Sequence, residues 1–274
     1  MIDVKDLGFS YRGSKHQVFS HFDLQLEQGR IYGLLGKNGT GKSTLLYLIS
    51  GLLIPGAGTV SVDGIESKLR RPELLSQIFI VPEEYTMPDM SFDALCGLMR
   101  QFYPSFSDEL LRQCLTEFEM PVTPNLKELS MGQKKKVYMS IAIATGTRLL
   151  IMDEPTNGLD IPSKALFRRV IAKYMSDDRT LIISTHQVHD IENLLDHVVI
   201  VDQSKVLLNS SIADISSHYT FRFLSPQEMD DRVLYSEPSL QGNSSIVVRG
   251  DGEDETQVDL ELLFNAVIGG AIKK

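Results

Sequence analysis

The feature that most constrains this chain is a glycine-rich loop between an apolar strand and a helix. Its residues are Gly36, Lys37, Asn38, Gly39, Thr40, Gly41, Lys42, Ser43 and Thr44. Glycines let the backbone curl close to a phosphate, and the helix that follows presents its positive end to the anion. The flanks agree, because residues 30–35 are typical of a buried strand and residues 45–49 of a helix that Gly51 closes. We therefore expect a nucleoside triphosphate site; a glycine-rich turn without a ligand is the alternative.

Two side chains of this loop predict how the triphosphate is held. Lys42 supplies a positive charge next to the phosphates. Ser43 is placed to offer its hydroxyl to a Mg²⁺ ion that bridges the β- and γ-phosphates. The loop therefore predicts a magnesium cofactor as well as the nucleotide.

Composition narrows the class of protein. The 274 residues suffice for one large domain or somewhat more, and the net charge of −9 disfavours a nucleic-acid partner despite the basic run 134–136. Cys96 and Cys114 fit free thiols in a reducing compartment. We see no cleavable signal and no apolar run near the ~20 residues that a spanning helix needs. We expect a cytoplasmic chain whose membrane work involves another chain.

The hydrophobic pattern predicts an α/β fold with a parallel sheet and a flanking antiparallel β subdomain. Residues 1–28 and 59–64 alternate apolar and polar side chains, as half-exposed antiparallel strands do. Four other segments are short, apolar throughout and typical of buried parallel strands: residues 78–81, 149–152, 181–184 and 198–201.

Two further segments depart from this core. A helical insertion is expected at about 90–140, with Leu95, Leu98, Met99 and Phe102 on one apolar stripe. After the core domain of residues 1–209, residues 210–274 predict a small hairpin-plus-helix extension of α+β type. Its role stays open between dimer contact, regulator binding and simple packing.

Three side chains at strand ends predict the chemistry. Asp153 and Glu154 follow an apolar strand at the edge where parallel sheets bind ligands. Asp153 would hold Mg²⁺ through water and Glu154 would act as general base, although strand-end carboxylates often only cap helices. His186 ends another strand at the same edge, where it would contact the γ-phosphate. A lone histidine is more often structural, and the pattern leaves that alternative open.

A helix start near residue 130 predicts a second anion contact. Ser130 and Gln133 have the spacing of a capping box, which stabilises a helix by ~1 kcal/mol. A capped helix start followed by lysines 134–136 also suits a phosphate, which must come from elsewhere.

At this point the chain resembles the ATP-binding subunits of ABC transporters, over nearly all of residues 1–205. Five motifs in order carry the resemblance: Walker A at Gly36 to Thr44, the signature at Leu129 to Gln133, Walker B at Leu149 to Glu154, the D-loop at Asn157 to Asp160, and the switch histidine His186. The resemblance implies a P-loop NTPase core that binds ATP and Mg²⁺.

The resemblance also implies a head-to-tail dimer, either homodimer or heterodimer, with ATP between one subunit's phosphate loop and the other's signature helix. Ser130, Gly132 and Gln133 would then contact the nucleotide in trans, with Asp160 in the neighbouring D-loop. Tyr11 aligns with the aromatic residue that stacks on adenine, although a core tyrosine is the alternative.

Two residues depart from the family pattern. Glu83 stands where the family has a glutamine that contacts magnesium and the attacking water. It keeps an oxygen ligand but adds negative charge, so metal affinity, rate or coupling would differ. Met131 replaces a signature glycine, which costs little if its φ is helical and ~1 kcal/mol or more if φ is positive.

The expected function is therefore an ATP-hydrolysing motor subunit for a separate membrane permease. Residues 102–106, the short insertion and the C-terminal extension resemble exporter subunits for antibiotics, peptides or lipids. The alternatives are an import subunit, an ABC ATPase of translation or DNA maintenance, and a regulatory module with weakened catalysis, for which Glu83 and Met131 would be the cause.

Overall fold

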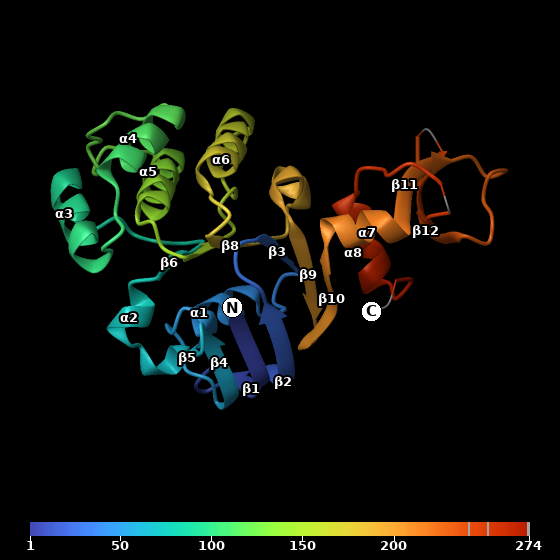
Figure 1. Ribbon diagram of the computed structural model, residues 1–274, viewed down its shortest axis with the longest axis horizontal. Coiled ribbons are helices and arrows are strands. Elements are labelled where there is room, and N and C mark those ends of the chain that lie inside the picture. Colours follow the sequence, from blue (N-terminus) through green and yellow to red (C-terminus); the bar gives the residue numbers. More distant parts are fainter. Residues whose placement is uncertain (241, 251, 273–274) are drawn as a thin grey trace.

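A six-stranded sheet forms the centre of the computed structural model, which describes residues 1–240, 242–250 and 252–272 (Figure 1). Its strand order is β10-β9-β3-β8-β7-β6. The strands are β3 (Ile31–Leu35), β6 (Ile78–Val81), β7 (Leu149–Asp153), β8 (Thr180–Thr185), β9 (His197–Asp202) and β10 (Lys205–Ser211). All neighbours pair in parallel except β10, which pairs antiparallel with β9. The predicted parallel strands are confirmed, and residues 149–153 are buried on both faces of the sheet.

A second, antiparallel sheet lies against one face of this core, as the alternating pattern predicted. Its order is β2-β1-β4-β5, with β1 (Ile2–Ser10), β2 (Gln17–Leu26), β4 (Ala57–Val62) and β5 (Ile65–Glu66). Helix α1 (Lys42–Ile49) contacts both β4 and β7, and its buried residues share one apolar core with both sheets (Figure 1). This layer holds the start of α1 at the end of β3.

Helices cover the opposite face of the central sheet. They are α3 (Phe92–Phe102), α4 (Asp108–Glu117), α5 (Met131–Ala144) and α6 (Ile161–Tyr174), while η1 (Ser67–Leu69) and α2 (Pro72–Leu75) precede β6. The apolar stripe expected at this position lies on α3 and is only partly buried. Leu95 is buried, but Leu98 is 36% and Phe102 64% exposed, and Phe102 lines a groove.

The C-terminal extension is larger than the expected hairpin and helix. It contains α7 (Ile212–His218), a sheet of order β11-β13-β12, and α8 (Leu260–Ile268). The sheet consists of β11 (Tyr219–Leu224), β12 (Val233–Ser239) and β13 (Gly242–Val248). Buried residues of α8 belong to the same apolar core as β9, so the extension packs on the ATPase core beside β9 and β10 (Figure 1).

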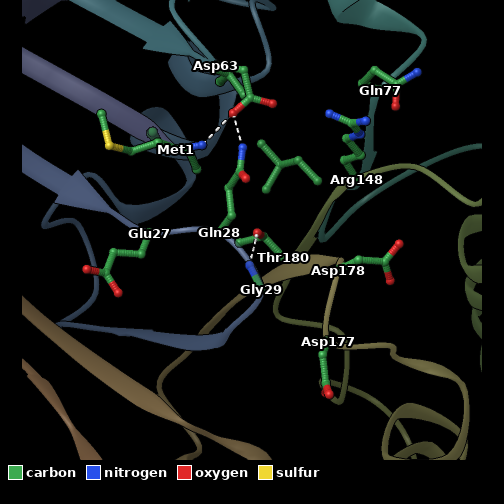
Figure 2. A pocket seen from close by; sticks show the side chains of 13 residues that line it. Met1, Glu27, Gln28, Gly29, Asp63, Gln77, Arg148, Asp177, Asp178 and Thr180 are labelled. Carbon is green, nitrogen blue, oxygen red and sulfur yellow. Dashed lines mark hydrogen bonds and ion pairs between the residues drawn. The ribbon is translucent and has the colours of Figure 1, made fainter.

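A groove of about 350 Å³ opens at the amino ends of the parallel strands, away from the phosphate loop (Figure 2). There the Met1 amino group and the Gln28 amide both donate to Asp63, and the Gly29 N–H donates to the Thr180 hydroxyl at 3.0 Å. Gly29 has φ +71°, and a Cβ would lie 2.3 Å from the Asp177 carbonyl. The Gly29–Thr180 contact ties the segment after β2 to the central sheet.

Within residues 1–240, 242–250 and 252–272, the helices are all too short or too polar to cross a bilayer.

Candidate nucleotide site

The phosphate loop leaves backbone donors free at the start of α1. Gly41 caps this helix with φ +95° and, among the residues that the structure describes, without a side-chain hydrogen bond, so the first amides of the helix have no acceptor within the helix. A Cβ at Gly41 would lie 2.6 Å from Val18 Cγ1, which is why a larger residue cannot replace it without a shift. Free N–H groups at a helix start suit phosphate oxygens.

Lys42 lies across the loop that it terminates. Its Nζ donates to the Gly36 carbonyl at 2.8 Å and to the Lys37 carbonyl at 3.2 Å. Thr40 also donates to the Lys37 carbonyl, at 2.9 Å. Burial lowers the pKa of Lys42, against the opposing effect of nearby carboxylates. A buried ammonium held by neutral carbonyls can stabilise a phosphate strongly, because little water screens it.

Asp153 and Ser43 form a donor set that fits magnesium. Asp153 Oδ1 accepts from the Ser184 hydroxyl, while its Oδ2 is buried and finds no hydrogen-bond donor in the part of the chain that the structure describes. Burial raises the pKa of Asp153, and the hydrogen bond from Ser184 opposes this. One carboxylate, one hydroxyl, phosphate oxygens and water are the ligands that Mg²⁺ prefers.

Glu154 is buried and held on both carboxylate oxygens. Its Oε1 lies 2.8 Å from His186 Nδ1, and its Oε2 accepts from the Thr185 hydroxyl at 3.2 Å and the His186 amide at 3.4 Å. Its backbone has φ +46°, a left-handed conformation that costs ~1–3 kcal/mol for a residue with a side chain. Strain of this kind is common at functional sites, and here it aims the carboxylate at His186.

Lys42, Ser43, Glu154 and His186 line one pocket of about 600 Å³, whereas the buried Asp153 is not among its lining residues. This pocket brings together ten of the predicted site residues, namely Tyr11, Asn38, Gly39, Gly41, Lys42, Ser43, Thr44, Glu83, Glu154 and His186. The pocket also contains His16 and Val18, which the sequence did not single out, and Asn157, the first residue of the expected D-loop. Tyr11 is 45% exposed, with its hydroxyl 2.9 Å from the Thr44 hydroxyl, so it is not a core tyrosine.

The signature residues Ser130, Gly132 and Gln133 do not line this pocket. They begin α5 with the predicted capping box: the Ser130 amide donates to Gln133 Oε1 at 2.9 Å, and the Gln133 amide donates to Ser130 Oγ at 3.3 Å. Met131 is the first residue of α5 and is absent from the positive-φ positions, so it costs little there. Asp160 caps α6, accepting from the Ser163 amide at 2.9 Å, and it also lies outside the pocket.

Lys135 is a contact that the sequence did not reveal. The run 134–136 was expected to lie at a phosphate site, but Lys135 is buried and donates to the carbonyls of Asn157 at 2.6 Å and Glu154 at 3.3 Å. It therefore links the signature helix to the strand end that carries Glu154. The signal was its place on the helix, since position 135 lies on the same face as the buried Met139.

Glu83 lines the pocket and contacts the D-loop residue Asn157. Its Oε1 accepts from the Asn157 side-chain amide at 2.9 Å, and it adds a negative charge beside Lys42 and Asp153. The metal contact predicted for Glu83 stays a prediction.

We expect Glu83→Gln to lower the KM for ATP by about 2- to 10-fold, because it removes a carboxylate that repels the triphosphate. The amide oxygen can still accept from Asn157, so the loop should keep its position. Steady-state ATPase kinetics measure this, with Glu109→Gln on the exposed face of α4 as the matched control. An unchanged or higher KM would show that Glu83 does not face the triphosphate.

Comparison with known proteins agrees with this geometry. The family model described as ABC transporter matches residues 19–157, just over half of the chain. The chain is 29% identical to the ABC transporter ATP-binding protein YtrB of Bacillus subtilis, over 80% of this chain and 75% of YtrB. It is also 29% identical to the Nod factor export ATP-binding protein I of Cupriavidus metallidurans, over 69% of this chain and 65% of that protein.

The chain is also similar to a relative named for import and to a solved structure. The methionine import ATP-binding protein MetN 2 of Listeria monocytogenes serotype 4b is 30% identical, over 77% of this chain and 65% of that protein. A structure described as the ATP binding subunit of an ABC transporter superposes with a TM-score of 0.70 at 25% identity, covering 79% of this chain and 92% of that one. This chain thus belongs to the ABC transporter family and is one of its ATP-binding subunits, an ATPase coupled to transport.

Proposed function

We propose that two copies of this chain bind and hydrolyse ATP between them and so drive a separate membrane permease. The observation that carries the proposal is the Glu154 carboxylate, held by His186 and Thr185 in the same pocket as Lys42. A carboxylate held beside phosphate-binding groups is placed to accept a proton from an attacking water.

Each residue of the pocket then has a role. Lys42 and the free amides at the start of α1 bind the phosphates, and Tyr11 offers its exposed ring to the adenine. Ser43 and Asp153 would hold Mg²⁺, which neutralises charge on the β- and γ-phosphates when bound. His186 orients Glu154 and reaches toward the γ-phosphate.

The second copy supplies what the pocket of a single chain lacks. Ser130 is exposed at the start of α5, its helix carries further amides, and it does not line its own chain's pocket. A head-to-tail dimer would place this helix start against the γ-phosphate of the other copy. Since one chain carries both halves of the site, we propose a homodimer.

A groove lined by β6 and the segments around it suits the permease. It has a volume of about 860 Å³ and is lined by residues that follow α1, by α2 and by the end of α3. Its lining includes exposed apolar side chains, with Leu52 54% and Phe102 64% exposed. Tyr138 of α5 lines it as well and stacks on Tyr85, two residues after Glu83, so the groove adjoins the nucleotide site. We propose that an apolar segment of the permease binds here, at the cytoplasmic face of the membrane.

Phe102→Asp should release the permease. A charge placed in the apolar groove costs binding energy, and we expect at least a 10-fold loss of permease in affinity co-purification. Phe223→Asp is the matched control, because Phe223 is 60% exposed but lies on the C-terminal extension. Melting temperatures should change little for both variants, since exposed side chains contribute little to folding. Equal permease recovery from the two variants would show that the permease does not bind in this groove.

Export is the direction that we propose for this transporter. One relative is named for Nod factor export and another for methionine import, so the names of the relatives do not decide the direction of transport. The exporter-like segment at residues 102–106 lies at the end of α3 beside the docking groove, where it would contact the permease. Transport assays in inverted vesicles with the permease present distinguish the two directions.

A further inference from the structure

The segment that follows His186 is clamped between two helices. It contains η2 (Val188–Asp190) and η3 (Glu192–Leu194). On one side lies α6, which begins at the D-loop: Lys164 Nζ donates to Gln187 Oε1 at 2.9 Å and pairs with Asp190 at 2.8 Å. Arg168 donates to the Asp190 carbonyl at 3.2 Å. The other side of the segment faces α8 of the C-terminal extension.

Two polar pairs join this segment to the extension. His189 Nε2 pairs with the Glu261 carboxylate of α8, and His189 Nδ1 lies 3.4 Å from Glu192. The Gln257 amide donates to Asn193 Oδ1 at 3.0 Å. Burial lowers the pKa of His189, but the carboxylates of Glu261 and Glu192 raise it by more, which favours an imidazolium between two carboxylates.

Apolar contacts and a shared pocket strengthen this link. Val188 and Ile191 are buried in the same core as Leu263 and Ala266 of α8. A pocket of about 540 Å³ has the phosphate loop as one wall, residues 185–190 as another, and Glu261, Phe264 and Asn265 of α8 as the third. The extension thus reaches the side of the nucleotide site on which His186 lies.

We propose that Glu261 and His189 are positioning residues through which the C-terminal extension fixes the segment after His186 and thereby sets the rate of ATP hydrolysis. His186 is three residues from His189, and its imidazole and its amide both contact the Glu154 carboxylate. Movement of this segment would therefore misplace the group that orients the general base, without touching the groups that bind the phosphates. The inference rests on the roles proposed above for Glu154 and His186.

The test compares steady-state ATPase kinetics of the full chain and its variants. Glu261→Ala should lower kcat about 3- to 30-fold and leave the KM for ATP within about 2-fold, as expected for a residue that acts through another. Glu261→Gln should recover part of the rate, because an amide oxygen can still accept from the imidazole. Asp254→Ala, an exposed acid on the same extension, should match the unchanged chain.

Two further measurements separate positioning from folding. The double variant Glu261→Ala/His189→Ala should be no slower than the slower single variant, because Glu261→Ala removes a contact that His189→Ala already removes. Hydrogen exchange of residues 186–194 should increase in Glu261→Ala while residues 36–44 keep their protection.

The outcomes also distinguish this inference from the proposed function. A kcat of Glu261→Ala equal to that of Asp254→Ala overturns the inference, and so does a joint loss of ATP affinity and folded structure. If His186→Ala retains the full rate, the proposed site itself fails. If His186→Ala is slow but Glu261→Ala is not, only the role of the extension fails.

Discussion

Glu154→Gln is expected to reduce ATP turnover by about 10²- to 10⁴-fold, the usual contribution of a general base. An amide oxygen can still accept from the Thr185 hydroxyl and the His186 amide, so the side chain should keep its place. It cannot take a proton from water. ATP affinity should therefore remain within a few-fold of the unchanged chain, as measured by titration calorimetry.

The same variant should trap the nucleotide-bound dimer. Because hydrolysis is what opens the proposed sandwich, Glu154→Gln with ATP should elute as a dimer in size-exclusion chromatography, and the ADP-bound form as a monomer. Glu109→Gln, on the exposed face of α4, serves as the control. If Glu154→Gln hydrolyses ATP at more than about a tenth of the normal rate, Glu154 is not the general base.

Local sequence patterns predicted the parts of the site that short segments encode. The phosphate loop, the strand ending at Asp153 and the capping box of Ser130 and Gln133 each depend on residues close in sequence. Their geometry follows from backbone conformation and helix-end hydrogen bonding, which neighbouring residues largely determine. The parallel strands were equally predictable, because burial on both faces leaves a continuous apolar run.

Contacts between distant segments were not predictable in this way. Lys135 was expected among lysines at a phosphate site, yet the fold buries it against the Glu154 and Asn157 carbonyls. The pair between His189 and Glu261 joins residues 72 positions apart, and no local pattern signals it. Phe102 continues the apolar stripe of α3 but faces an open groove. Periodicity predicts which side of a helix is apolar, and only the tertiary structure shows what covers it.

The buried charge of Asp153 lowers the free energy of unfolding when no cation is bound at this strand end. The side chain is 1% exposed, and its Oδ2 has no donor within the described ranges. Burial raises its pKa above the usual 3.8 of an aspartate, so folding favours the protonated form. The resulting stabilisation is complete only below the unfolded pKa and is lost as pH rises through the folded pKa. At neutral pH the ionised carboxylate therefore destabilises the nucleotide-free fold.

Asp153→Asn should consequently separate stability from function. Without nucleotide, we expect the variant to melt about 2–4 °C higher than the unchanged chain at pH 7, the shift that ~1 kcal/mol produces in a chain of this size. This difference should narrow as pH falls toward the folded pKa, where the native carboxyl is also neutral. In contrast, the variant should lose the added stabilisation that Mg²⁺ gives with ATP, together with turnover. Thermal melts with ATP in Mg²⁺ and in EDTA measure both effects. If Mg²⁺ stabilises Asp153→Asn as much as the unchanged chain, Asp153 does not hold the metal.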